Sequence, residues 1–358
     1  MIIAHIIISL NDGGAEGVLY RLCYNDRKHK HIVISLLDEG KYGLLLRKIG
    51  VDVFCLNINN KLSFFKSLLK LIKLLKRLKP DLVQTWMYHA DFFGGLISRL
   101  IGIRKIYWGV RNSNITFKSS NLISILIFRI NSILSNWIPE KIIYCSQRSK
   151  EIHELNGFNK SKGELIHNGY DFDKLLPSKK LREDFRIKNG IKSEIFLIGN
   201  VGRYNSDKDY KNLFSALSKF ERSNNLQIVL AGRNLDYNNK ELIEIIKTHG
   251  LTNQVRLMGQ IDNISSVMNG IDLFVLSSSS ESFPNVLSEA MACGSPCVTT
   301  DVGDASLIVG KTGWVVPPKD SDALAQAVSH AMEEKTRNQS KWAKRGDSCR
   351  NRMVENFD

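Results

Sequence analysis

Two cations follow a short apolar run in the second half of the chain. They are Arg203 and Lys208, and the run before them is Ile195–Val201. The run has the length and aliphatic composition of a buried strand, so the cations fall at its carboxyl end rather than on an ordinary solvated face. A guanidinium offers paired donors to a pyrophosphate, and an ammonium adds a compact charge. The pair predicts a binding site for the diphosphate of a leaving nucleotide. A surface ion pair with Asp207 or Asp209 is the alternative.

Two carboxylates, Glu281 and Glu289, follow a second apolar run, Leu273–Leu276. Asn285 could cap the helix predicted after this run, and the first helical amides, on Asn285–Leu287, would then be available to phosphate oxygens. Glu281 would precede the helix, and Glu289 would lie about one turn inside it among apolar residues, where an acid needs a partner. We expect the two carboxylates to accept hydrogen bonds from two sugars of one ligand. A loop charge and a helix-surface charge are the alternative.

A third loop, Asn11–Glu16, directly follows the first apolar run of the chain. Gly13 and Gly14 let the backbone turn tightly and approach a ligand at the start of the next helix, where anions are favoured. The pair lacks the G-x-G-x-x-G spacing, which disfavours a nicotinamide enzyme. An ordinary strand–helix turn would explain a paired glycine equally well.

These loops belong to a chain in which short apolar runs alternate with helical patterns. Such alternation predicts parallel sheets covered by helices on both faces. The 358 residues exceed the roughly 250–300 at which single cores stop growing, so we predict an α/β fold of two doubly wound, Rossmann-like domains facing a central cleft. Ligands bind outside the carboxyl ends of such strands. The predicted domains are residues 1–175 and 191–358, with a linker at 176–190.

The predicted elements can be read directly from the sequence. The predicted strands are Ile2–Ser9, His31–Leu36, Asp52–Leu56, Leu82–Trp86, Lys105–Val110, Lys141–Cys145, Glu164–His167, Ile195–Val201, Gln227–Ala231, Val255–Met258, Leu273–Leu276, Pro296–Thr300 and Gly313–Val316. The helices singled out between them are Lys61–Lys79, Ser119–Asn136, Asp209–Phe220, Asn239–His249, Asn285–Cys293 and Ser321–Glu333.

The positive charge of the chain is confined to its first half. Residues 1–180 hold 28 Lys and Arg against 14 Asp and Glu, which accounts for the whole net charge of +14. Such asymmetry indicates an anionic partner: nucleic acid, an anionic membrane surface or a phosphorylated acceptor. No recognisable nucleic-acid-binding motif accompanies the charge, so nucleic acid is disfavoured as the partner. The six cysteines are scattered and indicate reduced thiols in the cytoplasm rather than a metal site.

Several of these motifs together resemble one known family. Glu281 and Glu289 form an E-x7-E pair within SESFPNVLSEAMACGSPCVTTDVG, and Arg203 and Lys208 form GR-x4-K. This combination resembles the retaining GT-B glycosyltransferases of family 4, also called glycosyl transferases group 1. The likeness covers the second half nearly end to end, including TGWVVPPKD. In the first half it rests on GGAE and on IHNGYD at Ile166–Asp171.

The resemblance implies a role for each matching residue. Arg203 and Lys208 would bind the donor diphosphate, Glu289 the donor ribose, and Glu281 the transferred sugar. Neither a cofactor nor a bound metal is expected, because the cationic pair and the helix dipole would replace the cation. The anomeric configuration would be retained, and a UDP-sugar is favoured over a GDP-sugar as donor. Gly13 and Gly14 would allow close approach, and the backbone of Phe283, Pro284, Asn285, Val286 and Leu287 would contact the donor. The first predicted domain would then face the acceptor, and the second would hold the donor.

The sequence departs from the family pattern at one site position. Many members carry a histidine after the strand equivalent to Lys105–Val110, and here that place holds Arg111. The nearest histidine that follows another strand end is His89, so we expect Arg111 or His89 to position the substrate. Two D-x-D sequences, Asp171–Asp173 and Asp207–Asp209, are interpreted as coincidental rather than metal-binding.

The sequence therefore predicts transfer of a sugar to a glycan or a polyprenyl-diphosphate-linked acceptor, in surface polysaccharide synthesis of the O-antigen or capsule type. A GT-B nucleotide-sugar epimerase and a catalytically silent GT-B partner subunit are the alternatives. The segment Lys61–Lys79 carries Lys66, Lys70, Lys73 and Arg77 on one face, with Phe65, Leu68, Leu71, Ile72, Leu75 and Leu78 expected to cover the sheet. Each cation near an anionic lipid surface contributes about 1 kcal/mol, so we expect peripheral association with the inner face of the cell membrane. Ser119–Asn136 is a second candidate for membrane contact, and a solvated crossover helix is the alternative for Lys61–Lys79.

Overall fold

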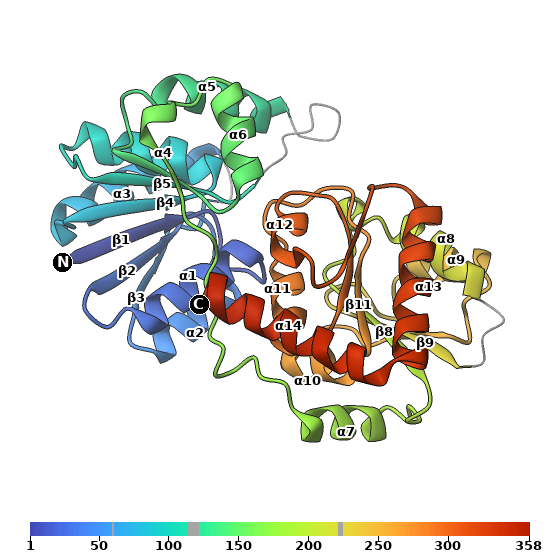
Figure 1. Cartoon of the computed structure of the whole chain (residues 1–358). Coiled ribbons are helices and arrows are strands. Elements are labelled where there is room, and N and C mark those ends of the chain that lie inside the picture. The colour runs from blue at the N-terminus through green and yellow to red at the C-terminus, as the bar shows by residue number, and fades with distance from the viewer. Residues whose placement is uncertain (59–60, 113–121, 221–224) are drawn as a thin grey trace. The chain divides into compact units, whose positions relative to one another are not determined.

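The computed structural model describes residues 1–58, 61–112, 122–220 and 225–358. Contacts divide the chain into two compact units, Met1–Asn168 and Gly169–Asp358 (Figure 1). Each unit is an α/β domain built on one parallel sheet with helices on both faces. The predicted fold class, two doubly wound Rossmann-like domains, is confirmed.

The first unit contains a seven-stranded sheet of order β3-β2-β1-β4-β5-β6-β7, in which every pairing is parallel. The chain moves from β1 outward to β3 and then returns to β4 beside β1, so the order reverses between β1 and β4. Ile7 in β1 lies opposite both Ser35 in β2 and Trp86 in β4, which brings the carboxyl ends of these strands level. Its strands are β1 Ile2–Ile7, β2 Lys30–Ser35, β3 Asp52–Cys55, β4 Leu82–Trp86, β5 Ile106–Val110, β6 Lys141–Tyr144 and β7 Gly163–Leu165.

Side chains of the first sheet alternate between two hydrophobic clusters, as the period of two in a strand requires. Ala4 and Ile6 pack with Leu71 and Leu75 of α3 on one face. Ile7 and Trp86 pack with residues of α1 and α2 on the other. The helices of this unit are α1 Gly14–Asn25, α2 Gly40–Lys48, α3 Lys61–Leu78, α4 Tyr88–Leu100, α5 Leu122–Leu134 and α6 Gln147–Leu155.

The second unit has a six-stranded parallel sheet of order β10-β9-β8-β11-β12-β13. Its strands are β8 Phe196–Val201, β9 Leu226–Ala231, β10 Val255–Leu257, β11 Leu273–Leu276, β12 Cys297–Thr300 and β13 Trp314–Val316. Its helices are α7 Lys179–Lys188, α8 Tyr210–Leu217, α9 Lys240–Thr248, α10 Ile264–Gly270, α11 Asn285–Ala292, α12 Ala305–Val309, α13 Ser321–Arg337 and α14 Gln339–Phe357.

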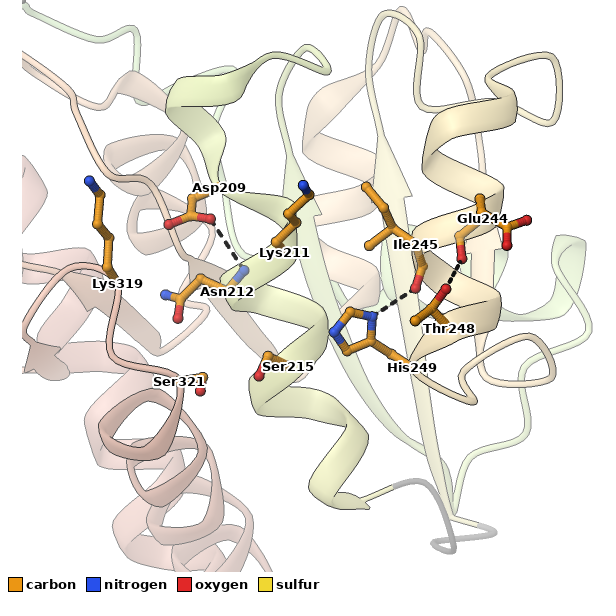
Figure 2. Close-up of a pocket in the computed structure, with 10 residues that line it drawn as sticks. All are labelled: Asp209, Lys211, Asn212, Ser215, Glu244, Ile245, Thr248, His249, Lys319 and Ser321. Carbon is orange, nitrogen blue, oxygen red and sulfur yellow. Dashed lines mark hydrogen bonds between the residues drawn. The ribbon is translucent and has the colours of Figure 1, made fainter.

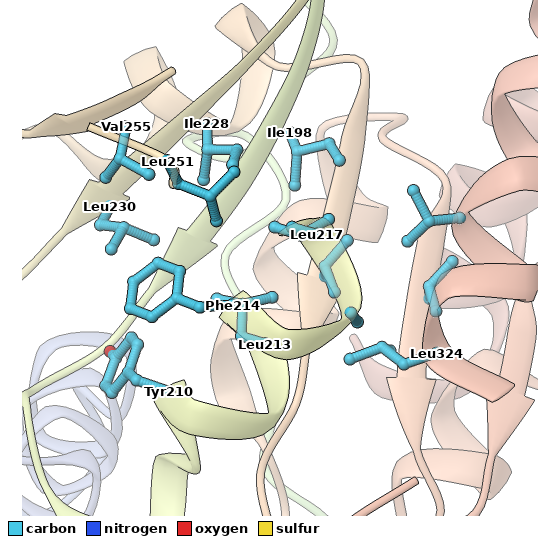
Figure 3. Packing of buried hydrophobic residues seen from close by; sticks show 14 of the residues in the cluster. Ile198, Tyr210, Leu213, Phe214, Leu217, Ile228, Leu230, Leu251, Val255 and Leu324 are labelled. Atoms are coloured by element: carbon cyan, nitrogen blue, oxygen red, sulfur yellow. The ribbon is translucent and has the colours of Figure 1, made fainter. Parts of the chain in front are cut away.

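One large hydrophobic cluster holds α8, α9 and α13 against the second sheet. Leu213, Phe214 and Leu217 from one face of α8 pack with Ile228 and Leu230 of β9 (Figure 3). All five side chains are fully buried. Burial of a side chain of this size contributes about 1.5–3 kcal/mol, so the cluster sets the position of the loop that precedes α8.

The predicted strands all occur, with ends shifted by at most two residues. The predicted domain boundary needs correction. The first unit ends at Asn168 rather than at residue 175, and most of the predicted linker forms α7 and belongs to the second unit. Arg182 and Arg186 of α7 bind the carboxylate of the buried Asp272, which explains why this polar segment is folded.

Helix α14 was not predicted from the sequence. Its sequence is rich in Lys and Arg, and only Cys349, Met353 and Phe357 are buried, so its apolar stripe is narrow. The predicted helix Ser119–Asn136 is observed as α5, and its residues 119–121 lie outside the described part of the chain. No described helix is both long and apolar enough to cross a membrane.

Candidate active site

The loops after β8 and β11 place Lys208 and Glu281 side by side. Lys208 Nζ lies 2.6 Å from Glu281 Oε1, and the two side chains are only 14% and 17% exposed. Ser278 Oγ donates to the same carboxylate oxygen at 2.8 Å. Lys208 therefore pairs with Glu281, and the predicted alternative of a surface pair with Asp207 or Asp209 is wrong for Lys208. Since β8 and β11 are neighbours in the sheet, the pair lies at its carboxyl edge.

The backbone around this pair is tied together across the two loops. The amide of Ser279 donates to the carbonyl of Asp207 at 2.7 Å, and Ser277 Oγ donates to the carbonyl of Lys208 at 2.9 Å. Gly303, after β12, adopts φ +54°, and a Cβ there would lie 2.2 Å from the carbonyl oxygen of Ser282. The Glu281–Ser282 segment is thus held by the close approach of another backbone, which only glycine permits.

Arg203 is the exposed cation of the site. Throughout the described residues its guanidinium makes no ion pair or hydrogen bond. The amide of the next residue, Tyr204, donates to the carbonyl of Arg233 and anchors the loop after β8. Lys208 has its carboxylate partner already, whereas Arg203 keeps five N–H donors available to an incoming anion. The two cations thus differ in availability, which their sequence spacing does not reveal.

The start of α11 differs in detail from the prediction. Pro284 is the N-cap and makes no side-chain capping bond, so Asn285 is the first helical residue rather than the cap. Asn285 Oδ1 instead accepts a hydrogen bond from Tyr170 Oη at 2.7 Å. The amide of Leu287 donates to the carbonyl of Pro284, so it is already engaged and the expectation that it is available is wrong. Val286 keeps an amide in the first turn, where helical geometry provides no carbonyl partner.

The other residues of the second unit that were predicted to bind the donor differ in how deeply they are buried. The side chain of Leu287 is fully buried, and Phe283 is 5% exposed with its ring against that of Phe357. These two side chains support the helix rather than a ligand. Glu289 is half-buried on the second turn of α11.

In the first unit, the loop Asn11–Glu16 connects β1 to α1, and Gly13 is the helix N-cap. Glu16 folds back over it: a Cβ on Gly13 would lie 2.4 Å from Glu16 Oε2. The helix start therefore already holds a carboxylate, which satisfies its positive end. A phosphate could approach Gly13 and Gly14 only after Glu16 moves away.

His89 and Arg111 both lie at the carboxyl edge of the first sheet. His89 is in the first turn of α4, directly after β4, and burial lowers its pKa. Arg111 follows β5, and its Nη1 donates to Asn168 Oδ1 at 2.5 Å. Its guanidinium carbon lies 4.7 Å from the ring centroid of Trp86, in cation–π contact. Sequence reasoning missed Trp86 and Asn168, because a tryptophan at a strand end looks like a core residue.

Neither D-x-D sequence forms a group of metal-ligating side chains within the described chain. Asp171 pairs with Lys174, and Asp209 caps α8 through the amide of Asn212. A cavity of about 680 Å³ lies in the second unit between α8, α9 and the start of α13 (Figure 2). It is lined by side chains such as Lys211 and His249, and neither Arg203, Lys208 nor Glu281 lines it. The cavity is therefore separate from the ion-paired site.

Comparison with known proteins agrees with this geometry. The model of the family described as glycosyl transferases group 1 matches residues 182–348, and the model described as glycosyltransferase family 4 matches residues 12–174. The chain belongs to glycosyltransferase family 4. Arg203, Lys208, Glu281 and Glu289 of this glycosyltransferase all lie within the first of these matches.

Two curated relatives and one solved structure show what the glycosyltransferase is similar to. A UDP-Gal:α-D-GlcNAc-diphosphoundecaprenol α-1,3-galactosyltransferase of Escherichia coli is 27% identical over 87% of this chain and 80% of its own length. The capsular polysaccharide biosynthesis glycosyltransferase CapM of Staphylococcus aureus is 25% identical over 76% of this chain and 73% of its own. The Anabaena protein HepE, solved in complex with UDP and glucose, matches with a TM-score of 0.87 and 24% identity, over 100% of this chain and 96% of HepE.

Proposed function

We propose that this glycosyltransferase moves a sugar from a UDP-sugar to a glycan or a polyprenyl-diphosphate-linked acceptor, with retention, in surface polysaccharide synthesis. The observation that carries the proposal is the pair of cations at the carboxyl end of β8. Lys208 is oriented by Glu281, whose carboxylate also accepts a hydrogen bond from Ser278, and Arg203 remains exposed. Similarity to an enzyme named for a UDP-galactose donor and a diphosphoundecaprenol acceptor supports the choice of substrates.

In the proposed reaction the bond between the anomeric carbon and the diphosphate oxygen breaks as the acceptor hydroxyl attacks from the same face. Negative charge develops on the leaving diphosphate, and Arg203 and Lys208 stabilise it. A leaving-phosphate oxygen accepts the proton of the acceptor hydroxyl, so no protein base is needed. Glu281 holds Lys208 before the donor arrives and accepts hydrogen bonds from the transferred sugar when it is bound. In this scheme the two cations supply the charge that a metal ion would otherwise supply.

Turnover of a panel of nucleotide sugars with lipid-linked acceptors tests the proposal. Arg203→Ala and Lys208→Ala should each lower turnover about 10²-fold or more, because each removes charge stabilisation from the leaving group. Lys240→Ala, which removes an exposed cation at the start of α9, is the matched control and should keep full activity. Near wild-type turnover in either site variant would refute the diphosphate assignment.

The same assay separates the other two function classes. An epimerase would convert the donor without an acceptor, whereas a transferase releases nucleoside diphosphate only when an acceptor is present. A silent partner subunit would do neither. The presence of Arg203, Lys208, Glu281 and Glu289, with two of them already ion-paired, favours an active enzyme.

We also propose that the first unit docks on an anionic membrane on the cytoplasmic side. The expected cations Lys66, Lys70, Lys73 and Arg77 of α3 are all exposed. The prediction that Phe65 covers the sheet is wrong, because its side chain is 69% exposed. Leu69 is also exposed, at 61%. The outward face of α3 thus combines cations with large apolar side chains, which is typical of a helix at a membrane interface.

Helix α5 adds an apolar surface on the same layer. Both α3 and α5 pack against α4. The exposed apolar side chains of α5 and its end are Leu122, Ile123, Leu126, Ile133 and Trp137, with exposed fractions between 47% and 82%. Exposed apolar groups in such a row mark an interaction surface. Cations attract anionic headgroups, and the apolar side chains contribute burial at the acyl boundary, so the two helices support one membrane-facing surface.

Co-sedimentation with vesicles tests the docking surface. Binding should require anionic lipid and should weaken at high salt, because screening reduces the attraction of the cations. Replacing Lys66, Lys70 and Lys73 by Glu should abolish it, while the same replacements at Lys240, Lys247 and Lys319 of the second unit should not. Binding that ignores lipid charge, or equal effects of the two triple variants, would contradict electrostatic docking.

A further inference from the structure

A chain of buried polar side chains crosses the core of the first unit, on the face covered by α1 and α2. His5 in β1 is 0% exposed, and His31 in β2 is 6% exposed. His5 Nε2 lies 2.9 Å from His31 Nδ1, and the two rings are stacked with centroids 5.2 Å apart. Neither histidine has a role in the proposed chemistry. Buried polar groups in an otherwise apolar cluster need a reason, because each costs free energy unless it is hydrogen-bonded.

The groups at the two ends of this row of polar side chains determine which ring nitrogens carry protons. Trp86 Nε1 can only donate, and it lies 3.3 Å from His5 Nδ1, so that nitrogen must be the acceptor. The His5 proton is therefore on Nε2 and is donated to His31 Nδ1. The His31 proton is then on Nε2, which lies 3.3 Å from the carboxylate oxygen Oδ2 of Asp26. The order Trp86→His5→His31 gives both histidines a neutral tautomer, and the Nε2 proton of His31 then faces Asp26 Oδ2 at ion-pair distance, without the geometry of a hydrogen bond.

Metal binding is the obvious alternative for this cluster. His5, Cys23 and His31 offer ligand atoms within 4.8 Å of one another. A metal would need His5 Nε2 unprotonated, which would move its proton to Nδ1, where it would face the N–H of Trp86 without an acceptor. Burial also raises the pKa of the Cys23 thiol to about 12, which disfavours the thiolate that a metal requires. The tryptophan thus selects the hydrogen-bonded chain over a metal.

The tryptophan end of this hydrogen-bonded chain reaches the carboxyl edge of the first sheet. Trp86 is the last residue of β4, fully buried, beside the point where the strand order reverses between β1 and β4. Ligands bind outside the carboxyl ends of strands at such a point. The face of the Trp86 ring supports the guanidinium of Arg111, which also donates to Asn168. The orientation of the indole therefore limits where the guanidinium of Arg111 can lie.

We propose that Trp86 is a positioning residue for Arg111, and that the His5–His31–Asp26 chain holds the indole in the orientation that Arg111 needs. This inference rests on the proposed function and on the choice of Arg111, rather than His89, as the residue that positions the substrate. Phenylalanine could not replace this tryptophan, because its ring offers a face to the guanidinium but no N–H to donate to His5. The buried histidines then act as a rigid spacer between the carboxylate of Asp26 and the indole of Trp86.

The first test is a double-mutant cycle on sugar transfer. Trp86→Phe keeps an aromatic face but removes the N–H, and it should lower kcat/KM about tenfold, the change that corresponds to one hydrogen bond. In the Arg111→Ala background the same substitution should have almost no further effect, because the residue through which it acts is gone. Trp108→Phe is the matched control. Trp108 is fully buried in the adjacent strand β5, and its Nε1 has no hydrogen-bond partner among the described residues. An equal loss in both Arg111 backgrounds, or an equal effect of Trp108→Phe, would overturn the proposal.

The second test does not depend on activity. Nitrogen-15 NMR of selectively labelled His and Arg should show both His5 and His31 protonated on Nε2 and not on Nδ1. The Nε–H signal of Arg111 should broaden in Trp86→Phe and stay sharp in Trp108→Phe. Protonation of either histidine on Nδ1, or an Arg111 signal unchanged by Trp86→Phe, would overturn the proposal. If the wild-type protein transfers no sugar, the proposed function fails. The NMR result then tests by itself whether the histidines hold Trp86 and Trp86 holds Arg111.

Discussion

Replacing Gly303 by alanine should disturb the active site through one backbone contact. Gly303 has φ +54°, and a Cβ there would lie 2.2 Å from the carbonyl oxygen of Ser282 and 2.7 Å from that of Glu281. A left-handed conformation costs an L-residue roughly 1–2 kcal/mol. Forcing a methyl group into packed surroundings adds about 1–3 kcal/mol. The free energy of unfolding should therefore fall by about 2–5 kcal/mol.

The expected effect on activity follows from the direction of the clash. The methyl group must displace the Glu281–Ser282 segment by about an ångström, since real Cβ contacts below 3.0 Å essentially do not occur. That movement separates Glu281 from Lys208, whose side chains are now 2.6 Å apart. A misplacement of about 1 Å in a catalytic group can lower turnover about 10²-fold. Sugar-transfer kinetics and urea unfolding of the same preparation measure the two effects.

Gly190→Ala is the matched control for this experiment. Gly190 has a similar φ of +61°, but a Cβ there meets nothing within 4 Å. It should lose only the roughly 1–2 kcal/mol of the left-handed conformation and keep its activity. If Gly303→Ala unfolds at the same urea concentration as Gly190→Ala and retains wild-type turnover, then close backbone approach does not position Glu281.

Four further outcomes are expected. Glu289→Gln should weaken binding of the nucleoside diphosphate alone, because a neutral amide is a poorer acceptor for ribose hydroxyls; unchanged affinity by calorimetry would remove Glu289 from the site. Sugar transfer should survive excess EDTA, whereas loss with rescue by manganese would show that the two cations do not suffice. Burial lowers the pKa of His5 to about 3 and that of His153 to about 4. As the pH falls below about 6.5, these two histidines take up protons in the unfolded chain but not in the folded one. The free energy of unfolding should therefore fall by about 1.4 kcal/mol per pH unit for each histidine. Urea midpoints that stay constant from about pH 6.5 to 4.5 would contradict this. Asp272→Asn should lower the free energy of unfolding by about 3–5 kcal/mol, because it removes the buried carboxylate that pairs with Arg182, Arg186 and Lys335. A decrease below about 1 kcal/mol in urea unfolding would show that these ion pairs contribute little.

Local patterns in the sequence determined the strands, the fold class and the positions of the candidate site loops. A parallel strand buried on both faces reads as a continuous apolar run, and the loop after it lies at the ligand-binding edge, so Arg203, Lys208 and Glu281 could be placed without coordinates. The period of the apolar residues also located α3 and α5. These features depend on neighbours within a few residues, which is why the sequence alone contains them.

Contacts between distant residues required the tertiary structure. The Lys208–Glu281 pair joins positions 73 residues apart, and the hydrogen bond between His5 and Trp86 spans 81 residues. Polar helices such as α7 and α14 were missed because their stability comes from partners elsewhere, as with Asp272. Exposure of Phe65 and fixation of the indole of Trp86 likewise depend on what packs beside them. Spacing along the chain can show which chemical groups reach the edge of a sheet, but only packing decides which of them meet.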